Sequence, residues 1–321
     1  MAEKRILVTG GAGFVGSNLC RALITDGHRV TVFDDLSTGM KSNVEDLENC
    51  QLITASLEDA EKVERSVMKS DYIVHLGARG SVPRSIKNPA ATFTSNVLGT
   101  FNIVESARKN NTPIIFSSSS SVYGSNTELP KVEKMWTSPI TPYAASKLSG
   151  EALVGSYGQS FGIQTIIFRF FNIFGTYQRP DHDYAAVIPK WIWKAMNKQV
   201  LQVYGDGTQT RDFTFVGDVV EVIRTTLTQG VTHPTPVNLA FGLRISLLEV
   251  LEKMKTFFPD LRVEFLPDRK GDVRYSQNSP ELLRQLFPNI QPKSFDDSLE
   301  ETILWLKENS KNITNGPAVI D

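Results

Sequence analysis

The chain has 321 residues, enough for one large domain or two modest ones, and carries 34 basic and 35 acidic side chains. This near balance provides no field that would attract nucleic acid or a membrane surface, and no apolar run approaches the roughly 20 residues that span a bilayer. The two cysteines, Cys20 and Cys50, are too few for a disulfide framework and lack the spacing of a metal site.

Short apolar, β-branched runs alternate with helical patterns over the first 170 residues. The expected strands are 6–8, 30–33, 51–54, 72–75, 114–116 and 165–168. Helical periodicity marks segments near 14–26, 58–69, 88–110 and 142–161. This alternation predicts an α/β fold, a doubly wound parallel sheet of the Rossmann type, with ligands at the carboxyl ends of the strands.

After about residue 175 the pattern loosens, and prolines and glycines separate shorter elements. Helices are expected near 186–196, 246–257, 280–286 and 296–309, and the chain is expected to return to the sheet near 213–230 and 237–240. We therefore divide it into a Rossmann domain, residues 1–175 with returns to the sheet near 213–240, and a smaller C-terminal α/β lobe, residues 176–321.

A glycine-rich turn directly follows the first expected strand and opens a helix. Gly10, Gly13 and Gly16 are spaced by three residues, which allows a tight turn and close approach of a pyrophosphate to the helix N-terminus. Asp34 and Asp35 end the second strand, where an acid accepts hydrogen bonds from the ribose hydroxyls and repels a 2′-phosphate. Asp34 is the better candidate. Residues 1–175 are thus expected to bind NAD, and the alternative is a glycine-rich turn without a ligand.

Tyr143 and Lys147 lie four residues apart in an expected helix, so their hydroxyl and ammonium groups can converge on one point. Beside a nicotinamide ring such a pair can transfer protons in alcohol–ketone chemistry. The spacing alone is weak evidence, because chance supplies it in many chains. Its meaning comes from the nucleotide loop that precedes it by about 130 residues.

Further motifs follow one another along nearly the whole chain. They are Thr9–Gly16, His75–Ala78, Ser81–Ser85, Asn96, Ser117–Gly124, Pro142–Lys147, Arg169–Asn172, Arg211–Phe213 and Arg269–Asp272. Each is weak alone, but the ordered set resembles the extended short-chain dehydrogenase/reductase family. Within that family the chain is most similar to NAD-dependent UDP-sugar 4-epimerases of the UDP-N-acetylglucosamine/UDP-glucose type.

The resemblance assigns a role to each motif. Tyr143 would be the acid/base, Lys147 would bind the nicotinamide ribose and lower the tyrosine pKa, and Ser119 would relay the proton of the sugar 4-oxygen. Residues expected to contact the cofactor are Gly10, Gly13, Phe14, Val15, Gly16, Asp34, Asp35, Thr38, Gly39, Ser56, Leu57, Leu76, Gly77, Ala78, Asn96, Ser117, Tyr143, Lys147 and Phe170. Residues expected to contact the substrate are Ser119, Ser120, Asn172, Val187, Gln202, Tyr204, Arg211, Arg269, Asp272 and Ser276.

Some of these positions have a more specific expected partner, and others stay open. The resemblance implies that Arg211 and Arg269 bind the diphosphate and that Asp272 binds the uridine ribose. Ser56 stands where many relatives carry an acid that contacts adenine. His75 is expected to be structural. Arg79 and Arg84 either line the site or cap a helix.

The residues after Ser119 distinguish reactions within the family. Dehydratases that resemble this chain carry an Asp-Glu pair there, and decarboxylases tend to carry a nearby glutamate, whereas this chain has Ser120 and Ser121. Oxidation and re-reduction at C4 of a UDP-hexose is therefore expected. The resemblance places Ser276 where a bulky tyrosine in relatives excludes 2-N-acetyl sugars, which favours UDP-GlcNAc and UDP-GalNAc here, with possible activity on UDP-Glc and UDP-Gal.

Other functions remain open at this point. They are a UDP-uronic acid 4-epimerase, another sugar-nucleotide epimerase or dehydratase, and a non-enzymatic NAD-binding sensor. The resemblance implies a homodimer through helices near 88–110 and 142–161. The chain reaches its first strand directly after Met1–Arg5, with no room for a secretory signal, so we expect a soluble, cytoplasmic protein without metal, nucleic acid or membrane partners.

Overall fold

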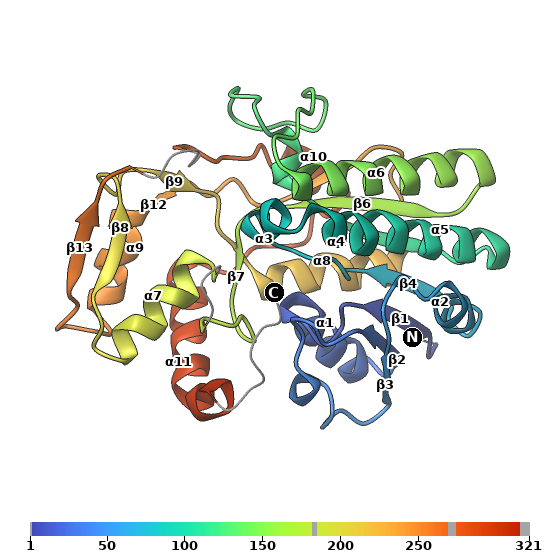
Figure 1. The fold of residues 1–321 in the computed structure, drawn as a ribbon, viewed down its shortest axis with the longest axis horizontal. Helices are drawn as coiled ribbons and strands as arrows, with labels where there is room; N and C mark the ends of the chain where they lie inside the picture. The colour runs from blue at the N-terminus through green and yellow to red at the C-terminus, as the bar shows by residue number, and fades with distance from the viewer. Residues whose placement is uncertain (1, 182–184, 269–273, 315–321) are drawn as a thin grey trace.

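The computed structural model of the chain describes residues 2–181, 185–268 and 274–314. Within them, a central parallel sheet has seven strands in the spatial order β3-β2-β1-β4-β5-β6-β11 (Figure 1). The strands are β1 Arg5–Thr9, β2 Arg29–Asp34, β3 Cys50–Thr54, β4 Tyr72–His75, β5 Ile114–Ser119, β6 Thr165–Phe170 and β11 Val237–Leu239. All six strands expected in the first 170 residues are present, and the predicted Rossmann fold is confirmed.

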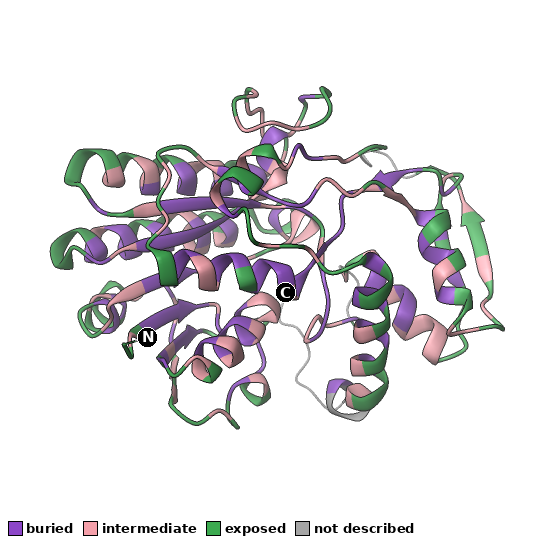
Figure 2. Ribbon diagram, turned by 180° about the vertical axis from the view of Figure 1, so that it is seen from behind, coloured by how far each residue is buried: buried purple, intermediate pink, exposed green. Residues whose placement is uncertain are grey.

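Helices cover both faces of this sheet. On one face lie α1 Phe14–Thr25 and α8 Val216–Gln229, and on the other α2 Ala60–Val67, α5 Gly99–Asn110 and α6 Pro142–Phe161. Successive residues of a strand point to opposite faces. Ile6 and Val8 therefore join the core with Leu19 of α1, whereas Leu7 packs with Val104 of α5. Figure 2 shows the strands buried between these two helical layers.

The expectation that residues 213–230 return to the central sheet is wrong. β10, Thr214–Phe215, pairs with β7, Ile173–Phe174, in a separate two-stranded sheet. Residues 216–229 form α8, because Val219, Ile223 and Leu227 recur every four residues and form one buried face. Valine-rich sequence favours strands, but packing against α1 decides the structure here. Among the residues after 175 that the structure describes, only β11, beside β6, joins the central sheet.

The helix expected over 88–110 is divided into three parts. They are α4 Pro89–Phe93, a π-helical turn Thr94–Leu98, and α5. π turns within helices are frequent at functional sites, and this one carries Asn96. Before it lies a short helix, α3 Val82–Lys87, which the sequence did not predict. Its first turn is capped by Ser81, whose hydroxyl accepts a hydrogen bond from the backbone N–H of Arg84 at 3.3 Å.

A smaller lobe lies beside the sheet (Figure 1). It contains α7 Val187–Met196, α9 Leu247–Lys255, α11 Phe295–Thr314, the parallel pair β8 Leu201–Tyr204 and β13 Val263–Leu266, and the antiparallel pair β9 Thr210–Arg211 and β12 Ile245–Ser246. Its core includes Trp191, Phe213 and Phe295. The remaining helix, α10 Glu281–Leu286, packs instead on the main sheet, where Phe287 contacts Phe168. No helix in the described part of the chain is long and apolar enough to cross a membrane.

Candidate active site

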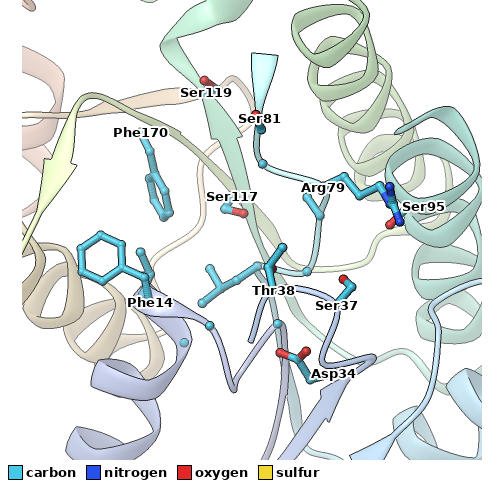
Figure 3. A pocket seen from close by; sticks show the side chains of 18 of the residues that line it. Phe14, Asp34, Ser37, Thr38, Arg79, Ser81, Ser95, Ser117, Ser119 and Phe170 are labelled. Carbon is cyan, nitrogen blue, oxygen red and sulfur yellow. The ribbon is translucent and has the colours of Figure 1, made fainter. Parts of the chain in front are cut away.

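A cavity of about 540 Å³ opens at the carboxyl ends of the central strands (Figure 3). This volume lies within the range of small-molecule and cofactor sites. Sixteen of the residues expected to contact the cofactor line it: Gly10, Gly13, Phe14, Val15, Gly16, Asp34, Asp35, Thr38, Leu57, Leu76, Gly77, Ala78, Ser117, Tyr143, Lys147 and Phe170. Ser119 and Asn172 from the expected substrate set line it as well.

The glycine loop leaves no room for side chains. Gly10 has a φ of +68°, and a Cβ on Gly16 would lie 2.2 Å from the carbonyl oxygen of Gly10. The N-cap of α1 is Gly13, which has no side chain to cap the helix. The backbone N–H groups of the first turn are thus open toward the cavity, as required for binding a pyrophosphate.

Asp34 lies buried at the end of β2, beside this loop. Its carboxylate accepts hydrogen bonds from the backbone N–H of Ala12 at 3.0 Å and of Leu36 at 2.9 Å. Burial raises the pKa of Asp34, and these two hydrogen bonds act in the opposite direction. Asp35 accepts from the backbone N–H and the hydroxyl of Ser37. Gly39 does not line the cavity, but a Cβ there would lie 2.9 Å from Oδ1 of Asp34.

The expected catalytic pair lies on the first turns of α6. Thr141 caps this helix, and Tyr143 and Lys147 project from it into the cavity. Lys147 Nζ donates a hydrogen bond to the carbonyl oxygen of Ser117 at 2.8 Å. Burial lowers the pKa of Lys147 to about 8, while the negative charge of Glu151 acts to raise it.

A short chain of hydroxyl groups leads to Tyr143. The side chain of Ser119, at the end of β5, is hydrogen-bonded to Tyr143. Ser121 donates to Ser119 Oγ from its backbone N–H at 3.2 Å and from its hydroxyl at 2.7 Å. Burial raises the pKa of Tyr143, and the hydrogen bond with Ser119 acts in the opposite direction. We expected a lowered tyrosine pKa; in the protein alone, burial outweighs the polar contacts because it penalises the charged phenolate.

Behind Tyr143 and Lys147 lies a buried ion pair. Glu151, one turn of α6 beyond Lys147, accepts hydrogen bonds from Ser118 Oγ at 2.5 Å and from Arg169 Nε at 2.9 Å. Arg169 Nη1 in turn donates to the Tyr123 hydroxyl at 2.9 Å, and that hydroxyl donates to Asn238 Oδ1 at 2.7 Å. This network therefore links α6 to β5, β6 and β11 next to the serines at 117–121.

Three residues expected to contact the cofactor lie outside the cavity lining: Gly39, Ser56 and Asn96. Ser56 Oγ accepts a hydrogen bond from the backbone N–H of Glu58 at 3.2 Å. Asn96 is buried, and its Oδ1 accepts from the backbone N–H of Arg79 at 2.7 Å while its Nδ2 donates to Ser146 Oγ at 2.9 Å. Asn96 thus fixes the loop before α3 against α6, the helix of Tyr143.

His75 is buried at the end of β4 and has a partner at each ring nitrogen. Its Nδ1 lies 2.6 Å from Thr9 Oγ1, and its Nε2 lies 3.0 Å from Thr100 Oγ1. Burial, together with the positive charge of Lys147, lowers the pKa of His75 to about 3. The ring is thus neutral and links three elements, which agrees with the structural role expected for it.

Only some of the residues expected to contact the substrate lie at the cavity. Asn172 Nδ2 lies 3.4 Å from Ser276 Oγ and 3.3 Å from the carbonyl oxygen of Asp212, which follows Arg211. Arg211 Nη1 donates to the carbonyl oxygen of Thr210 at 3.0 Å. Residues outside the cavity lining are Ser120, Val187, Gln202, Tyr204, Arg211 and Ser276, of which Gln202 and Tyr204 lie on the exposed side of β8. Arg269 and Asp272 lie outside the described residues.

Several lining residues were not predicted or were left without a role. Arg79 and Arg84, whose role the sequence left open, both line the cavity, and Arg79 reaches toward Ser95 (Figure 3). Others are Phe33, Ser37, Asn43, Ala55, Gly80, Ser81, Ser95, Ser118, Ile173, Tyr177, Gln178, Arg179 and Ala186. The segment around Tyr177 follows the Arg169–Asn172 motif directly, and this adjacency was the available signal.

These features together define a class of protein. A Rossmann sheet with an open glycine loop, a buried acid at the end of β2 and a Tyr/Lys pair facing one cavity is the arrangement of a dinucleotide-dependent oxidoreductase site. The residues present fit NAD, because the loop admits a close backbone approach and the carboxylate of Asp34, at the end of β2, can accept hydrogen bonds from a ribose. The chain belongs to the NAD dependent epimerase/dehydratase family, whose model matches residues 6–240, and NAD is its cofactor.

Proteins of known sequence and structure agree with this membership. The chain is 34% identical over 279 residues to UDP-glucuronic acid decarboxylase 1 of Danio rerio, which covers 84% of this chain and 65% of that longer protein. It is 33% identical to UDP-N-acetyl-alpha-D-glucosaminuronate decarboxylase of Bacillus cytotoxicus, over 95% of this chain and 98% of that protein.

Similar solved structures include sugar-nucleotide epimerases. The UDP-N-acetylglucosamine 4-epimerase of Methanobrevibacter ruminantium, in complex with UDP-N-acetylmuramic acid, superposes with a TM-score of 0.91 and 34% identity, covering 96% of this chain and 100% of that one. The UDP-glucose 4-epimerase of Thermus thermophilus, solved with NAD, gives a TM-score of 0.84 and 31% identity, covering 94% and 99%.

Proposed function

We propose that this protein is a nucleotide-sugar 4-epimerase that inverts C4 of a UDP-hexose through a 4-keto intermediate. The supporting observation is the site around Ser119, Tyr143 and Lys147. Among the described residues that line the cavity, Asp34 and Asp35 are the only carboxylates, and both belong to the ribose end. No described lining carboxylate stands beside Ser119 to abstract a proton from C5 or to assist loss of a carboxyl group.

The side chains of the site divide the proton chemistry among them. Tyr143 takes the proton of the sugar 4-hydroxyl through Ser119, and Ser121 holds Ser119 in place for this relay. The Lys147 ammonium stabilises the phenolate by its charge. When bound, NAD would accept a hydride from C4 and later return it, and its positive charge would also favour the phenolate. Tyr143 gives the proton back to the 4-oxygen through Ser119, so reduction on the opposite face of the sugar would invert C4 without net oxidation.

We propose UDP-GlcNAc and UDP-GalNAc as the preferred pair. Ser276 lies against Asn172, a residue that lines the cavity, and its small side chain leaves volume for a 2-acetamido group. A Ser276→Tyr variant is expected to lower kcat/KM for UDP-GlcNAc by about 10- to 200-fold, the cost of a filled pocket, while kcat/KM for UDP-Glc changes little. Turnover of both sugars by wild type and variant tests this. An unchanged preference would refute the role of Ser276.

A second candidate is a UDP-uronic acid 4-epimerase, and the observation that favours it is the cationic lining. Arg79 and Arg84 both line the cavity, and a guanidinium can bind a C6 carboxylate with two hydrogen bonds. Incubating the protein with a panel of UDP-hexoses, UDP-N-acetylhexosamines and UDP-uronic acids, and resolving the products, decides between the candidates. The panel also tests decarboxylation, which would appear as a UDP-pentose.

We further propose that the enzyme acts in the cytoplasm as a homodimer. Apolar side chains stand exposed along α3 to α5, among them Ile86 at 63% and Phe93 at 61%, with Leu98 and Phe101 nearby. A row of exposed large apolar side chains on adjacent helices is typical of an interface between subunits. The two cysteines are free, as in a reducing compartment.

A further inference from the structure

The segment that follows β7 crosses from the sheet to the smaller lobe and closes one side of the cofactor cavity. Its residues Tyr177, Gln178 and Arg179 line this cavity. The same three residues, with Asn43, also line a second cavity of about 210 Å³, whose other walls include Arg21 of α1 and Trp305 of α11. The segment is therefore a thin partition between the cofactor cavity and a second space.

The ring of Tyr177 is held from two sides by distant parts of the chain. The guanidinium carbon of Arg21 lies 4.9 Å from the centroid of the Tyr177 ring, and the centroid of the Trp305 ring lies 4.8 Å from it. Tyr177 has a φ of +64°, which a tyrosine adopts only where surrounding contacts hold it. The contacts from Arg21 of α1 and Trp305 of α11 contribute to holding it.

Thr176 is attached to the turn that binds pyrophosphate. Asn18 Nδ2 donates to the carbonyl oxygen of Thr176 at 2.9 Å and to that of Phe14 at 2.9 Å. Thr176 Oγ1 donates in return to Asn18 Oδ1 at 2.8 Å. Phe14 is the first residue of α1 and lines the cavity. The segment is thus fastened beside the open N-terminal turn of the helix.

Arg21 connects the same place to the loop after β2. Its guanidinium pairs with Asp46 at 3.0 Å and donates to the carbonyl oxygen of Asn43 at 3.0 Å. Helix α1, the loop at Asn43, the segment 176–179 and helix α11 therefore meet around the ring of Tyr177. Arg21 Nε and Gln178 Oε1 are buried at this junction and have no hydrogen-bond partner among the described residues.

We propose that Asn18, Arg21, Thr176, Tyr177 and Trp305 form a clasp that retains NAD during turnover. The clasp holds the partition 176–179 over the pyrophosphate-binding turn, and α11 supplies its outer side through Trp305. An epimerase must keep its reduced cofactor until the hydride is returned, so the inference rests on the proposed function for its purpose. The clasp itself acts on cofactor release and not on the chemistry at C4.

Two variants remove the clasp from different sides. Trp305→Ala deletes the outer ring. Tyr177→Asn deletes the central ring while relieving the backbone, because asparagine tolerates positive φ. Each protein is loaded with NAD, free NAD is removed by rapid gel filtration, and the bound fraction is followed over time. Both variants are expected to release NAD at least about tenfold faster than wild type.

Matched controls separate loss of the clasp from general loosening. Tyr177→Phe keeps the ring and both of its neighbours, and Trp136→Ala removes an exposed tryptophan from the loop before α6. Both are expected to retain NAD as wild type does. Release within about twofold of wild type in both clasp variants, or equally fast release from Trp136→Ala, would overturn the proposal. If Trp305→Ala fails to fold, Tyr177→Asn decides.

The two readouts keep the inference separate from the proposed function. NAD release is measured without any sugar present, so it is informative even if no UDP-sugar is epimerised. Faster release with no epimerase activity in wild type would leave the clasp standing and refute the proposed reaction. Epimerisation by wild type, together with unchanged NAD release from the clasp variants, would support the proposed reaction and refute the clasp.

Discussion

At the scale of single residues, one face of α6 carries three ionisable groups with different tasks. Tyr143, Lys147 and Glu151 recur every four residues, so a helix stacks them in a column leading away from the cavity. Tyr143 contacts the side chain of Ser119, and Lys147 donates a hydrogen bond to the carbonyl oxygen of Ser117. Glu151 forms an ion pair with Arg169. Burial disfavours the charged forms of Tyr143 and Lys147, and polar neighbours counteract it.

Replacing Tyr143 by phenylalanine removes only the hydroxyl at the head of this column. Turnover is expected to fall by about 100- to 10,000-fold, the usual contribution of a positioned acid/base. NAD binding is expected to persist, because the glycine loop and Asp34 are untouched. Steady-state rates with UDP-GlcNAc and NAD content after gel filtration measure the two effects. A variant that keeps wild-type activity would point to the NAD-binding sensor considered from the sequence.

Replacing Glu151 by glutamine tests the base of the column. The negative charge of Glu151 raises the pKa of Lys147 against the effect of burial, so its loss lowers that pKa further below about 8. Lys147 then loses its proton at a lower pH, and the alkaline limb of the kcat–pH profile should move to lower pH. The single variant also leaves Arg169 buried and unpaired, which costs about 3–5 kcal/mol of folding stability.

A double variant, Glu151→Gln with Arg169→Met, separates these two consequences. It removes both charges of the pair, so the stability loss should be much smaller. The shift of the alkaline limb should remain, because Lys147 still lacks its carboxylate neighbour. Thermal unfolding and kcat–pH profiles measured side by side give both quantities. Profiles that coincide with that of wild type in both variants would show that Glu151 acts only on stability.

At the scale of elements, local sequence patterns predicted most strands of the sheet and the nucleotide loop. Strands β1 to β6 are apolar runs and α1 opens on glycines, and both are short-range features. The π turn at Thr94–Leu98 and helix α8 could not be read in this way. The π turn is an irregularity inside one periodic pattern, and α8 is rich in valine, so packing against α1 overrides local preference.

The residues of the site also divide into those that a local sequence pattern predicts and those that it does not. Tyr143, Lys147 and Ser119 were predicted because their motifs are local and the resemblance gives them meaning. The contacts of Tyr177 with Arg21 and Trp305 join residues far apart in sequence, so no local pattern announces them. Gln202 and Tyr204 were expected at the substrate, but they lie on the exposed side of β8.

The turn between β1 and α1 provides a test at this scale. A Cβ on Gly16 would lie 2.2 Å from the carbonyl oxygen of Gly10, so Gly16→Ala must displace the backbone of the loop. Overpacking of this kind costs about 1–3 kcal/mol, and affinity for NAD should fall with it. Gly80→Ala is the matched control, since its added Cβ meets no atom within 4 Å. Titration of NAD and thermal unfolding of both variants measure the difference, and equal behaviour would contradict the close approach.

At the scale of the whole molecule, the cavity lies where the sheet and the smaller lobe meet. β7 and β10 form a two-stranded link between them; Asn172 leads from β6 into β7, and Gly175 and Thr176 lead out of it. The sheet side supplies Ser119, Tyr143 and Lys147, and on the lobe side Ser276 contacts Asn172 of the cavity lining. Figure 1 places α3, α4, α5 and α6 together along one edge, away from the smaller lobe. A second subunit bound there would leave the cavity free.

The proposed dimer makes a prediction about that edge. Phe93 and Phe101 are exposed by 61% and 41%, and lysines in their places would have to be desolvated in an interface between subunits. The variant Phe93→Lys with Phe101→Lys should therefore sediment as a monomer at concentrations where wild type is a dimer. Leu304→Lys, at a residue of α11 that is 47% exposed on the smaller lobe, should sediment as wild type does. A monomeric wild type, or a dimeric double variant, would exclude this edge as the interface.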